Sequence, residues 1–119
     1  MLIKPLQKCE EIVAGDKVII REILHPVKES LKLRYSLAHG TIRPGESSQR
    51  HKLVNSEVYY ILDGEGIMFI DNESEKVYPN QTIYVPPHAV QFIRNAGHRD
   101  LQFLCIVDPA WRPEDEELV

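Results

Sequence analysis

The sequence predicts an all-β fold in which short antiparallel strands form a sandwich or a barrel. Short runs rich in Val, Ile, Tyr and Phe recur along the 119-residue chain. Turn-forming residues separate them at intervals of about 8–12 residues, which is typical of β-sandwiches and barrels. No long stretch before residue 109 shows a clean helical period. A chain of this length can bury a substantial core, so we expect one domain over residues 1–119.

The N-terminal part of the chain is expected to be an irregular segment or an edge strand, followed by a regular strand. Residues 1–16 predict an irregular or edge segment that ends in a turn at Ala14-Gly15-Asp16. The run KVIIREIL at 17–24 has the β-branched content of a strand, and His25-Pro26 ends it. The next residues, VKESL, predict a loop or one short helical turn.

A long alternating stretch follows at 31–43. Leu31, Leu33, Tyr35 and Leu37 fall on one face, and charged or polar residues fall on the other. The pattern predicts a half-buried strand, which Pro44-Gly45 ends in a turn.

The centre of the chain carries most of the expected strands. ESSQRHKLVNS at 46–56 is polar and predicts an irregular segment. Asp63-Gly64-Glu65-Gly66 predicts a tight hairpin connection, and Pro79-Asn80 predicts a turn in which Asn tolerates a left-handed backbone. We expect strands at EVYYIL (57–62), IMFID (67–71), EKVY (75–78), TIYV (82–85), AVQFIRN (89–95) and DLQFLCIVD (100–108).

The tail and the cysteines carry less information. Residues 109–119 predict a tail that packs Trp111 on the barrel and frays after it, with partner recognition as the alternative. Cys105 lies in an apolar run and is expected to be a buried small hydrophobe. Cys9 lies in a polar stretch that allows exposure. The two share no metal-clip spacing, and we expect no disulfide between them.

Composition excludes several classes of function. There are 14 Lys and Arg against 18 Asp and Glu, a net charge of −4, and no basic patch of the kind that nucleic acid needs. The N-terminal residues MLIKPLQKCEEIV place charges inside their apolar pattern, which predicts neither a signal peptide nor a membrane helix. We therefore expect a cytoplasmic protein with no nucleic-acid or membrane partner. The sequence contains no glycine-rich phosphate loop, GxSxG elbow or EF-hand pattern.

Two motifs within residues 44–95 resemble those of the cupins. The first cupin motif is a Gly, five residues, His, one residue, His, three or four residues, Glu, six residues and Gly. Gly45, His51, Glu57 and Gly64 match it at this spacing, and Leu53 stands where the second His belongs.

The second cupin motif is a Gly, five residues, Pro, one residue, Gly, two residues, His, three residues and Asn. Pro86 and Asn95 match it, whereas Asn80 and His88 replace the two glycines and Gln91 replaces the His. The resemblance covers residues 31–108. It implies a small single-domain cupin, which is a double-stranded β-helix or jelly-roll barrel.

The resemblance also implies where a metal would lie. Typical cupins hold a divalent metal with three His and one Glu, and the equivalent positions here are His51, Leu53, Glu57 and Gln91. Leu cannot act as a ligand, and Gln offers only a neutral oxygen. We expect a transition metal (zinc, iron, manganese or nickel) to be weakly held or absent, with His51, Glu57 and Gln91 as its ligands. Nearby substitutes would be His88, Tyr59 or His39.

Two functions follow from the resemblance. One is a binding module whose barrel mouth, lined by His51, Glu57, Tyr59 and Gln91, holds a small polar ligand. The other is an enzyme similar to the metal-dependent cupin isomerases, decarboxylases or dioxygenases, with His51 and Glu57 at its centre. A third possibility is a structural protein that has lost its activity. Small cupins also pair as homodimers, and residues 17–24 are the candidate for a strand added to the partner's sheet.

Overall fold

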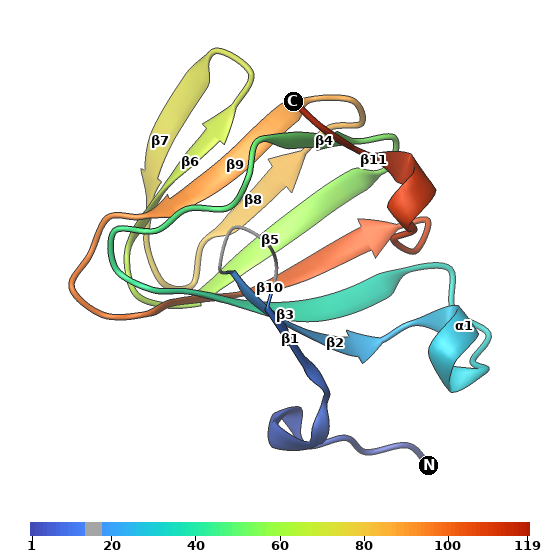
Figure 1. The fold of residues 1–119 in the computed structure, drawn as a ribbon. Helices are drawn as coiled ribbons and strands as arrows, with labels where there is room; N and C mark the ends of the chain where they lie inside the picture. The colour runs from blue at the N-terminus through green and yellow to red at the C-terminus, as the bar shows by residue number, and fades with distance from the viewer. Residues whose placement is uncertain (14–17) are drawn as a thin grey trace.

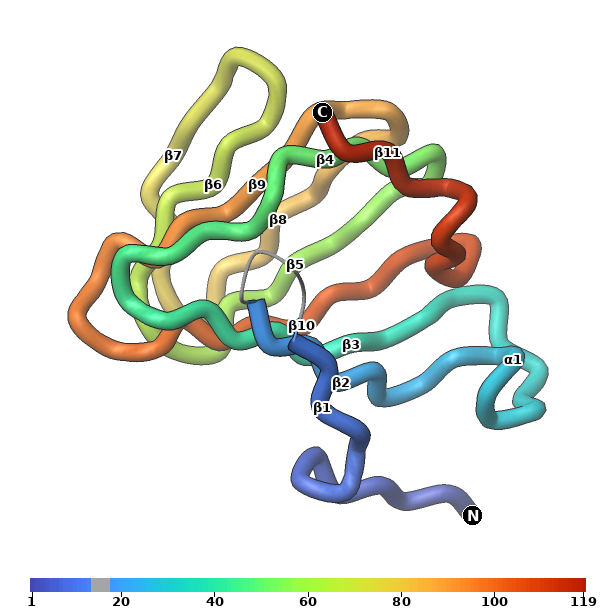
Figure 2. The backbone as a smooth tube through the Cα atoms, in the orientation of Figure 1, coloured from blue at the N-terminus to red at the C-terminus, as the bar shows by residue number. Residues whose placement is uncertain are grey.

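The computed structural model describes residues 1–13 and 18–119, and most of them lie in antiparallel strands. Two sheets face each other, and the chain passes repeatedly from one to the other (Figures 1 and 2). The predicted turn at Ala14-Gly15-Asp16 lies outside the described residues. The all-β jelly-roll prediction is confirmed.

Helix is confined to single turns, and α1 begins at Pro26, so the helical turn is the alternative adopted by the residues for which a loop or a short helical turn was predicted. The elements in chain order are η1 (Leu6–Lys8), β1 (Glu11–Val13), β2 (Ile19–Leu24), α1 (Pro26–Glu29), β3 (Ser36–Ile42), β4 (His51–Leu53), β5 (Ser56–Asp63), β6 (Gly66–Ile70), β7 (Glu73–Val77), β8 (Thr82–Val85), β9 (Val90–Asn95), β10 (Leu101–Asp108), η2 (Pro113–Asp115) and β11 (Glu116–Leu118). No helix among these residues is long and apolar enough to span a membrane.

The two sheets enclose one apolar core. The six-stranded sheet has the order β1-β2-β3-β10-β5-β8, and the five-stranded sheet has the order β11-β4-β9-β6-β7. Alternate residues of each strand point between the sheets, as the twofold period of a strand requires. The buried core residues are Val18, Ile42, Tyr59, Ile61, Met68, Val77, Val85, Ala89, Ile93, Leu101 and Phe103.

The third strand is shorter than predicted and turns its other face inward. It begins at Ser36, not at Leu31, and Ser36 and Ile42 are buried whereas Tyr35 is exposed. Gly40 faces the core, where a Cβ atom would lie 2.5 Å from the Phe103 ring. The absence of a side chain at Gly40 therefore makes room for Phe103, and Leu37, the one residue of the predicted Leu-rich face that lies in β3, is on the outward face.

Two segments predicted to be irregular form a strand pair. His51–Leu53 is strand β4, and it pairs with β11 in the C-terminal residues that we expected to fray. Asn55 ties the two together, because its Nδ2 donates to Pro109 O at 3.0 Å and to Asp115 Oδ2 at 3.3 Å. The sequence did not predict this strand pair, because β11 is exposed and has no apolar alternation.

The N-terminal residues form the edge of the six-stranded sheet. β1 pairs with β2 and lies outside it, within the segment 1–16 predicted to be irregular or an edge, so residues 19–24 are not at the edge of the sheet. Cys9 is buried, with 6% of its surface exposed. Both cysteines are free thiols in this structure.

The residues that replace the glycines of the second motif keep the backbone conformation that a glycine would favour. Asn80 has a φ of 70° and His88 a φ of 68°. The left-handed region costs roughly 1–2 kcal/mol for a side chain with a Cβ atom. The backbone N–H of His88 donates to Leu53 O at 2.7 Å, so this turn holds strand β4 against the start of β9.

Candidate functional site

The centre of the site is a carboxyl group inside the barrel. Glu57 lies on β5, with β10 and β8 on either side, and it shares the inward face with Tyr59 and Ile61. Only 7% of Glu57 is exposed. Its Oε1 atom is fully buried and has no hydrogen-bond partner among the described residues. A buried carboxyl oxygen without a donor costs free energy, so this atom marks a place where a partner would bind.

Gln91 faces Glu57 and Tyr59 from the opposite sheet. It lies on β9 and is 1% exposed, and its Oε1 accepts a hydrogen bond from the Tyr59 hydroxyl at 2.8 Å. This bond joins the two sheets across the interior. Gln91 therefore uses its amide oxygen within the protein and keeps its N–H groups for Glu57 or a ligand.

His51 completes the group from β4. It is the direct cross-strand neighbour of Gln91, so the two side chains share the inner face of the five-stranded sheet. Its Nδ1 lies 2.7 Å from Gln49 O. A carbonyl oxygen can only accept, so Nδ1 carries the proton, and Nε2 of the neutral ring is an acceptor or a metal ligand.

Burial governs the electrostatics of the site. It raises the pKa of Glu57 because the apolar interior disfavours the carboxylate, and the nearby His51, Cys105 and Gln91 offset this only in part. Burial and the Glu57 charge also raise the pKa of Tyr59 well above its usual range. The Tyr59 phenol therefore stays a hydrogen-bond donor at neutral pH.

Cys105 is a site residue that the sequence analysis missed. It lies on β10 directly opposite Tyr59, packs partly buried against the core, and contributes to the electrostatics of Glu57. Burial and Glu57 raise the pKa of its thiol well above the usual value, which makes it a poor nucleophile. The signal was the alternation of Leu101, Phe103, Cys105 and Val107, which places the thiol on the inner face.

The residues do not fit the metal centre that the fold family implies. Leu53 is 3% exposed and fills one ligand position with an apolar side chain. Within residues 1–13 and 18–119, no group of three or more His, Cys, Asp or Glu side chains could hold a metal ion. His51 and Glu57 remain as a pair, and the oxygen of Gln91 already accepts from Tyr59.

Two of the expected substitutes do not join the site. His39 is buried on β3, and burial together with Arg21 lowers its pKa. Arg21 is its cross-strand neighbour on β2 and Leu104 its neighbour on β10, so His39 faces away from the core side of the sheet. His88 is exposed in the turn before β9. Tyr59 alone of the three lies beside Glu57.

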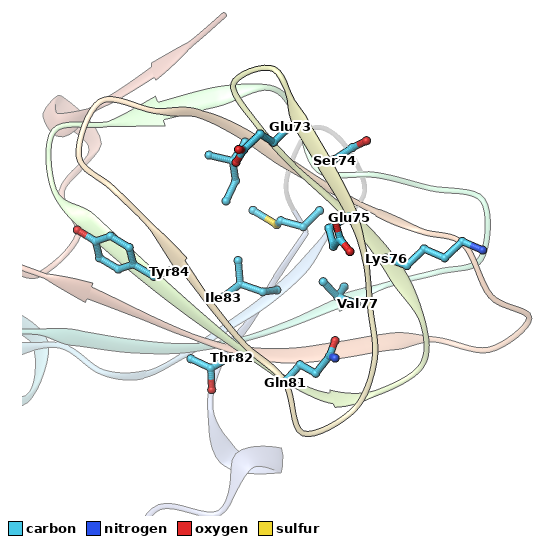
Figure 3. Close-up of a pocket in the computed structure, with 11 residues that line it drawn as sticks. Glu73, Ser74, Glu75, Lys76, Val77, Gln81, Thr82, Ile83 and Tyr84 are labelled. Atoms are coloured by element: carbon cyan, nitrogen blue, oxygen red, sulfur yellow. The ribbon is translucent and has the colours of Figure 1, made fainter.

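A groove of about 750 Å³ opens beside the site, where the edge strands of the two sheets come apart (Figure 3). Strand β7 ends the five-stranded sheet and β8 ends the six-stranded sheet, and the groove lies between them. Its apolar lining residues include Met68, Ile70 and Ile83. Ile70 is the cross-strand neighbour of Gln91, and Ile83 is that of Tyr59, so the groove borders the site through these two residues.

Comparisons with known proteins agree with this geometry. The cupin domain family matches residues 38–107. An uncharacterised protein of Methanocaldococcus jannaschii, MJ1618, is 39% identical over 114 residues, which cover 94% of this chain and 90% of the relative. Auxin-binding protein T85 of Nicotiana tabacum is 27% identical over 100 residues, covering 75% of this chain and 51% of that protein.

A solved structure is similar over nearly the whole chain. The crystal structure of a protein described as a predicted oxalate decarboxylase from Thermotoga maritima superposes with a TM-score of 0.78 at 25% identity. The match covers 91% of this chain and 99% of that one. The jelly-roll topology, the two motifs and these matches together show that the chain belongs to the cupin family.

Proposed function

We propose that this cupin binds a small polar molecule inside its barrel, against His51, Glu57, Tyr59 and Gln91. The observation that carries the proposal is the buried Oε1 of Glu57, which has no donor among the described residues. Such an atom is stabilised when a bound molecule donates a hydrogen bond to it. The Tyr59–Gln91 hydrogen bond supports the proposal, because it fixes two polar side chains next to this carboxyl group.

The proposed binding of a polar molecule does not require a metal. One imidazole, one carboxylate and one engaged amide oxygen would hold a divalent transition metal weakly. The metal-dependent enzyme is the second candidate function, of the isomerase, decarboxylase or dioxygenase type. It is favoured by His51 Nε2, which the Gln49 contact leaves as an acceptor beside Glu57. The description of the Thermotoga maritima relative fits that class.

Titration of the ¹⁵N-labelled chain with a library of small polar molecules tests the binding proposal. Amide signals of residues 51–59 and 90–92 should shift on binding, and Glu57→Gln should weaken the same molecules. Glu10→Gln, at an exposed carboxylate before β1, is the matched control and should leave binding unchanged. A binder that shifts other amides and is insensitive to Glu57→Gln would contradict the proposal.

We also propose that the chain forms homodimers in the cytoplasm. The outer face of the six-stranded sheet exposes large apolar side chains on three neighbouring strands, at Tyr60, Leu62, Tyr84 and Ile106. A second copy covering this face would remove them from water. Light scattering should give twice the chain mass at micromolar concentration, and a monomer mass would refute the proposal.

A further inference from the structure

A row of neighbouring side chains joins the barrel interior to the groove. Direct cross-strand pairs connect His51 to Gln91, Gln91 to Ile70, and Ile70 to Glu73. These four residues therefore form one row across the inner face of the five-stranded sheet. Neighbouring strands lie about 4.8 Å apart, so Glu73 stands about 10 Å from Gln91 along this row.

The charged side chains of the groove are arranged asymmetrically. Glu73 and Glu75 share the face of β7 that carries buried Val77, so both carboxylates line the groove side. Lys76 lies on the alternate face, and its chain extends away from the other lining residues in Figure 3. The mouth of the groove is therefore negative.

The interior beyond the mouth carries the same sign. The buried polar and charged residues within the described chain are Ser36, His39, Asn55, Glu57, Gln91 and Asn95. None of these is Lys or Arg, and His39 faces away from the interior. The ionisable nitrogen that lies near Glu57 is that of His51, a half-buried residue whose Nδ1 proton points to Gln49 O. A carboxylate ligand entering here would meet the carboxylates of Glu73, Glu75 and Glu57, whereas the one Lys of the groove lining, Lys76, lies on the opposite face of β7.

From this arrangement we infer that the ligand is an organic cation, an amine with an apolar body, and that carboxylate ligands are excluded. This inference rests on the function proposed above. The ammonium group donates hydrogen bonds to the unpartnered Oε1 of Glu57, and the apolar body lies against Ile70, Ile83 and Met68. Glu73 and Glu75 attract the cation to the mouth. An ion pair with Glu57 inside the barrel is screened by water far less than one at the surface.

Three molecules of nearly equal shape test the inference: phenethylamine, 2-phenylethanol and 3-phenylpropionate. They carry an ammonium, a hydroxyl and a carboxylate on the same phenylethyl body. Titration calorimetry on the purified chain should give the tightest binding for the amine, by roughly tenfold or more over the carboxylate. Glu57→Gln should remove this preference. The Glu73→Gln/Glu75→Gln double variant should weaken the amine a few-fold in low salt and less in high salt, whereas Glu10→Gln should change nothing.

The outcomes separate this inference from the proposed function. Equal or tighter binding of 3-phenylpropionate, at a site still sensitive to Tyr59→Phe, would overturn the cation inference and leave the binding function standing. Equal binding of 2-phenylethanol and the amine would likewise overturn selection by charge. If none of the three binds at millimolar concentration while another polar molecule shifts the amides of residues 51–59 and 90–92, the inference is overturned and the proposed function stands.

Discussion

Replacing Glu57 with Gln should stabilise the ligand-free protein at neutral pH. Gln has nearly the same shape, so it keeps the packing against Val85 and Val107, the cross-strand neighbours of Glu57. It removes a charge that is 7% exposed and whose Oε1 has no donor among the described residues. A buried polar group without a partner costs about 1–3 kcal/mol. At about 4 °C per kcal/mol for a domain of this size, the melting temperature should rise by about 4–12 °C.

The stability gained by replacing Glu57 with Gln should increase with pH. Burial raises the pKa of Glu57, so the folded state binds this proton more tightly than the unfolded chain does. The stability that the protonated carboxyl contributes is complete below its unfolded pKa, about 4.3, and is lost as pH rises through the folded value. The variant and the parent should therefore melt together near pH 4 and separate as the pH approaches 8.

Thermal unfolding followed by circular dichroism at several pH values measures this difference. Glu75→Gln removes an exposed carboxylate from β7 and serves as the matched control. Its difference in melting temperature from the parent should not change with pH. A Glu57→Gln variant that is less stable than the parent at pH 8 would refute the argument. It would mean that Cys105 and Gln91, the hydrogen-bond partners that lower the pKa of Glu57, stabilise the carboxylate by more than its burial destabilises it.

The remaining predictions concern packing, turns and metal affinity. Tyr59→Phe should cost about 1–2 kcal/mol in urea unfolding, because it leaves the buried Gln91 Oε1 without its 2.8 Å donor; no change would mean that another group takes over. Gly64 and Gly45 have φ values of 82° and 81°, but a Cβ at Gly64 would lie 2.5 Å from Asp100 O whereas one at Gly45 meets nothing within 4 Å. Gly64→Ala should therefore cost about 1–3 kcal/mol more than Gly45→Ala in the same assay, and equal costs would contradict the clash. Leu53→His with Gln91→His should tighten zinc or nickel binding by orders of magnitude in calorimetry, since it restores three imidazoles and one carboxylate. Val54→His with Gln91→His is its control, because Val54 is 51% exposed and lies beyond the end of β4. Equal affinities of the two double variants would show that Leu53 does not face a common site.

The sequence was most informative where a residue pattern has one structural meaning. The hairpin glycine, the prolines and the runs of β-formers predicted β5 to β10 with bounds that differ by at most two residues. Motif spacing predicted that His51, Glu57 and Gln91 lie together, and the structure brings them into one interior cluster with Tyr59. Asn80 and His88 even keep the left-handed backbone of the glycines that they replace.

The missed features depend on contacts between residues far apart in the chain. Strand β4 forms because β11 pairs with it, and neither has an apolar period that could predict it. The inward face of β3 is set by Gly40 beneath the Phe103 ring, which outweighs the alternation of leucines. Cys105 was predicted to be buried and is partly buried against the core, but its position opposite Tyr59 depends on the register between β10 and β5. The groove exists because β7 and β8 end different sheets, which is a property of topology.

The central claim is that the polar cluster around Glu57 is a ligand site and not a preformed metal centre. The most direct measurement is the transition-metal content of the freshly purified chain, prepared without chelator and determined by inductively coupled plasma mass spectrometry. With Leu53 and Gln91 at two of the four ligand positions, we predict well below one metal per chain, unchanged by Glu57→Gln. One equivalent of zinc, iron, manganese or nickel that is lost in Glu57→Gln would contradict the account and favour the metal-dependent enzyme.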